Sequence, residues 1–228
     1  RCSPDSARPR CAARDNALVR CFSSTRWRSR SAIICAAWLN RCSVSIISRL
    51  VHQKGIDLLA EVGPVLSRVP ARLAVLGSGD RSTEESTASL AARFPGVIAF
   101  RQGYDADLAH RMFAGGDLTV IPSRFEPCGL TQMQAMRYGT IPIVADVGGL
   151  HDTVTDADAH PRSGNGIVMA AVSGAGLADG IHRAARLWSR AARRVRVQQR
   201  GMTHDWSWTE PARRYIELYE SILDSSAS

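Results

Sequence analysis

The sequence has little lysine, few aromatic residues and no long apolar run. Lysine occurs only at Lys54, so arginine supplies nearly all of the 29 basic side chains. No stretch of eighteen or more apolar residues is present, and we therefore expect no membrane-spanning helix. The first thirty residues are rich in arginine and serine and lack the apolar centre of a signal peptide. These absences predict a cytoplasmic protein with no membrane partner.

Acidic residues are scarce in residues 1–45, which hold nine arginines and two aspartates. The rest of the chain holds twenty basic and nineteen acidic groups, so its net charge is close to zero. A formal net charge of +8 would ordinarily suggest nucleic acid as a partner, but the excess belongs almost entirely to this first segment. We therefore expect the folded part of the chain to bind no nucleic acid.

Cysteine is also nearly confined to that segment. Five of the six cysteines lie within residues 1–45, and only Cys128 lies beyond them. The five form no C-x-x-C pair and have no suitably spaced histidines, so we expect no metal site. We interpret residues 1–45 as a basic, Cys/Arg-rich extension that is disordered or mis-translated. Residues 46–228 are then expected to form one domain.

From about residue 43 onward, patterns typical of strands and helices alternate along the chain. Short apolar runs predict strands at 43–50, 71–76, 97–100, 117–122, 141–145 and 166–169. Helical spacing predicts helices at 55–69, 81–94, 105–115 and 130–138, with more helices at the end. Connections of two to six residues predict a doubly wound parallel α/β sheet, in which ligands bind beyond the carboxyl ends of the strands.

Two details refine these predicted helices. Pro64 is an unfavourable interior residue for a single helix over 55–69. Asp105 is suited to cap the helix at 105–115, which ends in glycine.

The loop 123–132 (SRFEPCGLTQ) carries the strongest functional signal, because it joins a buried strand to a helix. Its end brings free backbone N–H groups and the positive end of a helix dipole to one point, which suits a phosphate. Glu126, in the same loop, supplies a carboxylate that can hold a sugar hydroxyl. The combination favours a nucleotide-sugar site.

Other loops at this edge of the sheet contribute further candidates. Lys54, as the only lysine, suggests a need for a compact ammonium group, and Arg49 can join it in clamping a diphosphate. Gly77 allows a nucleotide to approach or simply turns the chain. Tyr104 stacks on a base or only packs. Gly148 and Gly149 again permit close approach of another backbone or a ligand to the chain.

In their order and separation, these motifs resemble the C-terminal half of bacterial glycogen synthases of the ADP-glucose type, which are close to plant starch synthases. The matching segments are SRLVHQKGIDLL at 48–59, LGSGD at 76–80, GYDADLAHRMFAGGD at 103–117, PSRFEPCGLTQMQAMRYGTIPIV at 122–144, GGLHDTV at 148–154, GNGIV at 164–168 and MTHDWSW at 202–208. The resemblance covers nearly four fifths of the chain. It implies the Rossmann-like C-terminal domain of a GT-B glycosyltransferase.

The same resemblance implies retaining transfer of glucose from ADP-glucose to the nonreducing end of an α-1,4-glucan, with no metal and no other cofactor. By similarity, Arg49 and Lys54 neutralise the departing diphosphate, Glu126 hydrogen-bonds the donor glucose, and Tyr104 packs on the adenine. The other substrate-binding residues proposed are Gly77, Cys128, Gly129, Leu130 and Thr131.

The sequence departs from the family at two points. Gln134 stands where wider GT-B relatives carry a second glutamate, and the Lys-x-Gly-Gly-Leu motif of the N-terminal GT-B domain is absent. We therefore expect that domain to be missing here. The last helix is expected to reach back to it through an apolar face formed by Tyr215, Leu218, Tyr219 and Ile222.

Three alternatives stay open. The chain is a catalytically inactive nucleotide-sugar-binding fragment, a related GT-B enzyme that uses another sugar nucleotide, or a module that binds RNA or DNA through residues 1–45. The lack of interleaved aromatic residues in that segment argues against the last.

Overall fold

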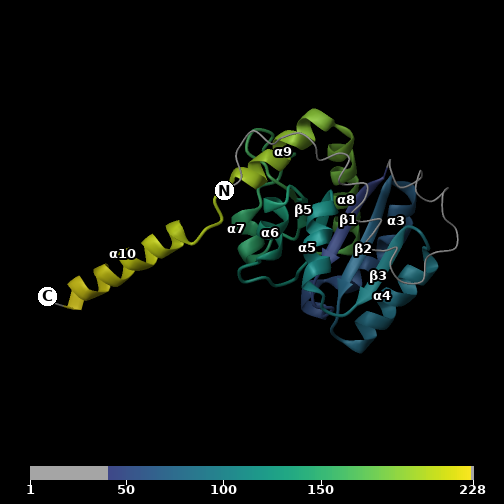
Figure 1. Ribbon diagram of the computed structural model, residues 1–228, viewed down its shortest axis with the longest axis horizontal. Helices are drawn as coiled ribbons and strands as arrows, with labels where there is room; N and C mark the ends of the chain where they lie inside the picture. Colours follow the sequence, from purple (N-terminus) through teal and green to yellow (C-terminus); the bar gives the residue numbers. More distant parts are fainter. Residues whose placement is uncertain (1–40, 227–228) are drawn as a thin grey trace.

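The computed structural model describes residues 41–226, which contain a six-stranded sheet with helices on both faces (Figure 1). The strands are β1 (Cys42–Ile47), β2 (Ala71–Gly77), β3 (Ile98–Gln102), β4 (Leu118–Ile121), β5 (Ile141–Val144) and β6 (Ile167–Val168). They pair in parallel in the order β3-β2-β1-β4-β5-β6. This confirms the predicted doubly wound, Rossmann-like sheet.

The predicted extension at residues 1–45 lies outside the described residues except for its last five. Within those five, β1 already begins at Cys42.

The helical segments are η1 (His52–Lys54), η2 (Ile56–Glu61), α3 (Gly63–Arg68), α4 (Arg81–Arg93), α5 (Ala106–Gly115), α6 (Thr131–Arg137), α7 (Gly148–Thr153), α8 (Gly174–Ser189), α9 (Ala191–Thr203) and α10 (Thr209–Ser226). The single helix predicted over 55–69 is wrong: a 3-10 helix and a short α-helix occupy that range. Gly55, at φ 67°, begins the first, and Pro64 lies in the first turn of the second, where its missing N–H is harmless. The predicted cap of α5 is confirmed, because the Leu108 N–H donates to the Asp105 carboxylate at 2.8 Å.

Helices pack on both faces of the sheet, and alternate residues of each strand point into the cores on opposite sides. Val44 and Ile46 of β1 belong to the larger apolar core, which also contains residues of η2, α3, α4 and α8. Ala74 and Leu76 of β2 belong to a smaller cluster with α5 on the other face. This packing leaves the two edges formed by the strand ends for the loops.

An ion-pair network fixes the segment before β6 to α8. Arg183 Nη2 donates to both oxygens of Asp156 at 2.6 Å, and its Nε donates to Asp158 at 2.8 Å. Arg183 Nη1 donates to the Val168 carbonyl at 2.9 Å. Burial alone would raise the pKa of Asp156, but hydrogen bonds from the Val168 N–H, from other backbone N–H groups and from Arg183 lower that pKa overall.

The last helix, α10, extends away from the rest of the molecule (Figure 1). The side chains at Tyr215, Leu218, Tyr219 and Ile222 are each more than half exposed. Just before α10, Trp206 packs against a small apolar cluster that includes Met136 and Leu150. In residues 41–226, no helix has both the length and the apolar character needed to cross a membrane.

Candidate functional site

The site lies at the carboxyl ends of β1 and β4, the two central strands. From β1 the chain continues to β2 on one side, whereas from β4 it continues to β5 on the other. The loops that follow therefore diverge and leave a crevice, the usual ligand position in a doubly wound sheet. A cavity of about 210 Å³ is present there. Its walls include Arg49 and Lys54 from the first loop and Ser123 and Glu126 from the second.

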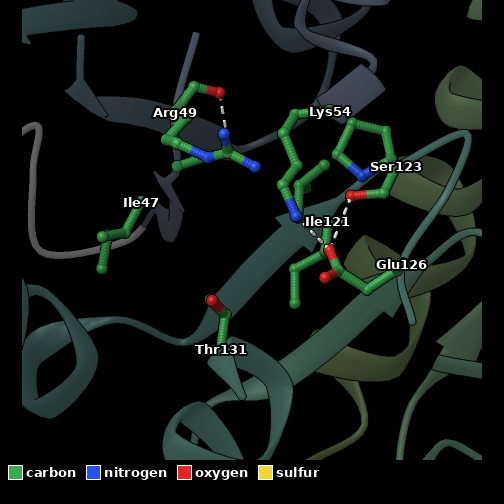
Figure 2. A pocket seen from close by; sticks show the side chains of 10 residues that line it. Ile47, Arg49, Lys54, Ile121, Ser123, Glu126 and Thr131 are labelled. Carbon is green, nitrogen blue, oxygen red and sulfur yellow. Dashed lines mark hydrogen bonds and ion pairs between the residues drawn. The ribbon is translucent and has the colours of Figure 1, made fainter. Parts of the chain in front are cut away.

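An ion pair occupies one wall of the cavity. Lys54 Nζ lies 2.5 Å from Glu126 Oε2, and the side chains are only 15% and 12% exposed. The buried Ser123 hydroxyl donates to the same carboxylate oxygen at 3.1 Å. Figure 2 shows the three side chains pointing toward one another. Within residues 41–226, the other Nζ–H groups and Glu126 Oε1 have no hydrogen-bond partner, so they are available to a ligand.

Arg49 supplies a second positive charge to the same cavity. Its side chain is exposed and forms no ion pair with any described residue. Two cations and one carboxylate leave the cavity with a positive charge, which attracts an anionic ligand such as a diphosphate.

The start of α6 forms the opposite side of the cavity. Gly129 adopts φ 70°, and the residue at the N-cap, Leu130, gives no side-chain cap. In the described part of the chain, the N–H groups of Gly129, Leu130 and Thr131 have no acceptor. Thr131 lines the cavity, whereas Cys128 lies outside its lining as an exposed free thiol. The roles proposed for these residues stay predictions.

Of the other sequence-predicted residues, Gly129 and Leu130 are outside the cavity lining like Cys128, and so are Tyr104 and Gly77. Tyr104 follows β3, is 91% exposed and is not among the residues that line the cavity. Gly77 ends β2, and a Cβ there would lie 1.9 Å from the Ser48 carbonyl oxygen. The local need for glycine at this position comes from packing against the neighbouring loop. Contact of either residue with a nucleotide stays a prediction.

The glycine pair at the start of α7 supports the loop that carries Glu126. A Cβ on Gly148 would lie 2.2 Å from the Glu126 carbonyl oxygen, and one on Gly149 would lie 1.8 Å from that of Cys128. The Gly149 N–H donates to the Glu126 carbonyl at 2.9 Å. The close backbone approach expected here is therefore made by the chain's own loop.

Sequence reasoning missed the contact that joins the two site loops. Arg124 Nη1 and Nη2 donate to the two carboxylate oxygens of Asp57, both at 2.7 Å. The hydrogen bond from Arg124 lowers the pKa of Asp57, and the same bond raises the pKa of Arg124. The two residues are 67 positions apart, and no local pattern in a single sequence links them.

The described residues contain no group of three or more histidine, cysteine or carboxylate side chains that suits a metal ion. The expectation that neither a metal nor another cofactor is required stays a prediction.

The fold agrees with that of the known proteins that this chain matches. The chain belongs to the family of glycosyl transferases group 1, whose model matches residues 42–201. It is 45% identical over 182 residues to the glycogen synthase of Halorhodospira halophila (strain DSM 244 / SL1). That alignment covers 80% of this chain but only 38% of the relative, so the chain spans well under half of its length.

Two solved structures also match this chain. The catalytic domain of starch synthase IV from Arabidopsis thaliana, bound to ADP and acarbose, matches with a TM-score of 0.79 and 30% identity. The match covers 92% of this chain and 42% of that one. The C-terminal domain of a group 1 glycosyl transferase (LpcC) from Francisella tularensis matches in fold, at 20% identity and a TM-score of 0.58, over 71% of this chain and 82% of that domain. The predicted likeness to the C-terminal GT-B domain of glycogen and starch synthases is confirmed.

Proposed function

We propose that this chain is the donor-binding half of a glycogen (starch) synthase, which transfers glucose from ADP-glucose to the nonreducing end of an α-1,4-glucan with retention. The observation that carries the proposal is the cavity at the ends of β1 and β4. It gathers Arg49, Lys54 and Glu126 in a chain 45% identical to a glycogen synthase. The Arabidopsis starch synthase was bound to ADP, which supports an adenine nucleotide as the donor.

In this proposal, the positive side chains stabilise the charge that develops on the departing diphosphate. While Lys54 holds Glu126, its other N–H groups have no acceptor in residues 41–226, and the Arg49 guanidinium forms no ion pair with any described residue. Both can therefore donate to phosphate oxygens without first losing a partner. The free Glu126 Oε1 accepts a hydrogen bond from a glucose hydroxyl. The retaining course taken from the family requires no protein nucleophile.

Two partners complete the proposal. The relatives are more than twice as long as the segment they share with this chain, and we infer that a second GT-B domain closes over the cavity. The glucan acceptor would enter between the two domains, where closure excludes water. A cytoplasmic location belongs to the same proposal.

Binding and turnover measurements test this function. We expect calorimetry to detect ADP binding to the chain, weaker binding of UDP, and loss of ADP affinity in Lys54→Met. Transfer of labelled glucose into glycogen is then compared between ADP-glucose and UDP-glucose, with Glu126→Gln as the inactive reference. A folded protein that binds neither nucleotide would contradict the proposal.

The coverage of 38% favours one second candidate, a nucleotide-sugar-binding fragment without activity. ADP binding without incorporation of glucose from either donor would support it. Preferential incorporation from UDP-glucose would instead indicate a related GT-B enzyme with another sugar nucleotide.

A further inference from the structure

The loops that carry Lys54 and Glu126 are joined to each other outside the cavity. The guanidinium of Arg124 binds both oxygens of Asp57 at 2.7 Å, and its Nη1 also donates to the His52 carbonyl at 2.8 Å. One side chain thus holds residues on both sides of Lys54 in the sequence, from a position two residues before Glu126.

Main-chain contacts reinforce this junction. The Arg124 N–H donates to the Gln53 carbonyl at 2.9 Å, and Gln53 Nε2 donates to the Phe125 carbonyl at 3.1 Å. Gly55 lies so close to the other loop that a Cβ on it would be 2.0 Å from the Pro122 carbonyl oxygen. The neighbours of Lys54 are therefore fixed to the neighbours of Glu126.

We propose that Arg124 and Asp57 are positioning residues: they form a brace that sets the Lys54 ammonium in the cavity before a ligand arrives. The nature of that ligand rests on the proposed function, whereas the brace itself does not. A lysine side chain has many rotamers, and a loose loop would add backbone freedom that the ligand would have to remove. A preformed position avoids this loss and places the charge where it is needed.

Stability alone gives the pair little reason to exist. Arg124 and Asp57 side chains are 29% and 46% exposed, and exposed ion pairs contribute little to folding free energy. The two-pronged geometry, by contrast, fixes direction as well as distance, and only arginine can supply it. The brace is therefore expected to act on the placement of Lys54 more than on unfolding.

The composition of the chain provides a direct probe. Lys54 is the only lysine, so acylation of its amine by an activated ester can be followed by mass spectrometry of the peptide that contains it, with no other lysine contributing to the signal. We expect Arg124→Ala and Asp57→Ala each to raise this acylation rate about tenfold, as the loss of the charge-assisted hydrogen bonds between the two side chains implies. Arg124→Lys keeps the positive charge but lacks the two parallel N–H donors of the guanidinium, and it should give an intermediate acylation rate.

A matched control removes an arginine from another surface ion pair. Arg81 of α4 pairs with Glu85 and is 91% exposed, far from the cavity in sequence. Arg81→Ala should leave the acylation rate of Lys54 unchanged.

ADP affinity provides the second readout. Arg124→Ala should weaken ADP binding about tenfold, on the same reasoning. Because the brace acts through Lys54, the double variant Lys54→Met/Arg124→Ala should bind no more weakly than Lys54→Met. A purely structural role would instead add the two losses.

The outcomes separate the two ideas. An unchanged acylation rate in folded Arg124→Ala, or additive losses of ADP affinity, would overturn the brace. Faster acylation in a chain whose wild type binds no ADP would support the brace and defeat the proposed function. If Arg124→Ala does not fold, Arg124→Lys and Asp57→Asn take its place; unfolding of these as well would assign the contact to stability and overturn the proposal.

Discussion

Two ion pairs of this molecule are equally buried and yet differ in character. Lys54 and Glu126 are 15% and 12% exposed, and Arg183 and Asp156 are 15% and 13% exposed. Burial therefore does not distinguish the pair in the cavity from the pair beside β6. What differs is how much of their hydrogen-bonding capacity the protein itself uses.

The pair beside β6 is saturated. Asp156 Oδ1 accepts from two backbone N–H groups, Oδ2 accepts from the Val168 N–H, and Arg183 contacts both oxygens. In the cavity, Glu126 Oε1 and two Nζ–H groups of Lys54 find no partner in residues 41–226. Native proteins rarely leave such groups unused without reason, so the unused capacity makes the Lys54–Glu126 pair the candidate for ligand binding.

Removing Arg183 should give the largest effect. Arg183→Ala leaves the partly buried Asp156 carboxylate without its cation, whereas Asp158 keeps Arg193, and we expect a loss of about 3 kcal/mol in the free energy of unfolding. Urea unfolding measures this loss, with the exposed Arg186 of the same helix as the control (Arg186→Ala). If Arg183→Ala lowers the free energy of unfolding by less than Arg186→Ala does, the pair beside β6 is not a structural pair.

Removing Lys54 should have the opposite effect: a small change in the free energy of unfolding and a large loss of ADP affinity. Lys54→Met keeps the apolar stem, and Glu126 keeps its hydrogen bond from Ser123 and faces a cavity, so we expect the free energy of unfolding to change by about 1 kcal/mol or less. ADP affinity should fall about thirtyfold, as loss of a charge-assisted hydrogen bond to phosphate implies. Calorimetry on the same samples used for unfolding checks both values. Strong destabilisation would show that this pair is structural too.

Lowering the pH should remove the contribution of the Arg183–Asp156 pair to the free energy of unfolding. Despite its burial, hydrogen bonds lower the pKa of Asp156 in the folded state. Its stabilising contribution is therefore complete above the ordinary value of about 3.9 and is lost as the pH falls through the lower folded pKa. Unfolding free energies measured between neutral and strongly acidic pH should decrease more steeply for the wild type than for Asp156→Asn. Parallel curves would disprove this linkage.

The smallest effect is expected at Tyr104, which is not among the residues that line the cavity. Tyr104→Ala should leave the free energy of unfolding within about 0.5 kcal/mol of wild type. If the side chain packs on adenine, ADP affinity should decrease about fivefold while pyrophosphate affinity stays the same. Equal ADP affinity in the two proteins would remove Tyr104 from the site.

Much of the fold follows from local signals in the sequence. Buried parallel strands are continuous apolar runs, which is why the runs at 117–122 and 141–145 predicted every end of β4 and β5 to within one residue. The cap at Asp105 is likewise a local pattern. The range 55–69 was predicted as one helix from its apolar spacing, but Pro64 lacks the N–H that a helix interior needs and lies instead in the first turn of a second, short helix.

The site was predicted in part for the same reason. Lys54 and Glu126 stand out by composition and by motif, but nothing local indicates that they contact each other, nor that Arg124 holds Asp57. Such contacts depend on which strands become neighbours. In this sheet, the pairing of β1 with β4 brings together residues 72 positions apart.

That separation has a consequence for how the molecule assembles. The chain between the two loops builds β2 and β3 and their helices, so joining Lys54 to Glu126 closes a long loop and costs correspondingly more entropy than any local contact. The cavity should therefore be among the last parts to form during refolding. Protection of the single lysine from acylation, followed in time after dilution from denaturant, would then mark the completed molecule and lag behind the appearance of helix.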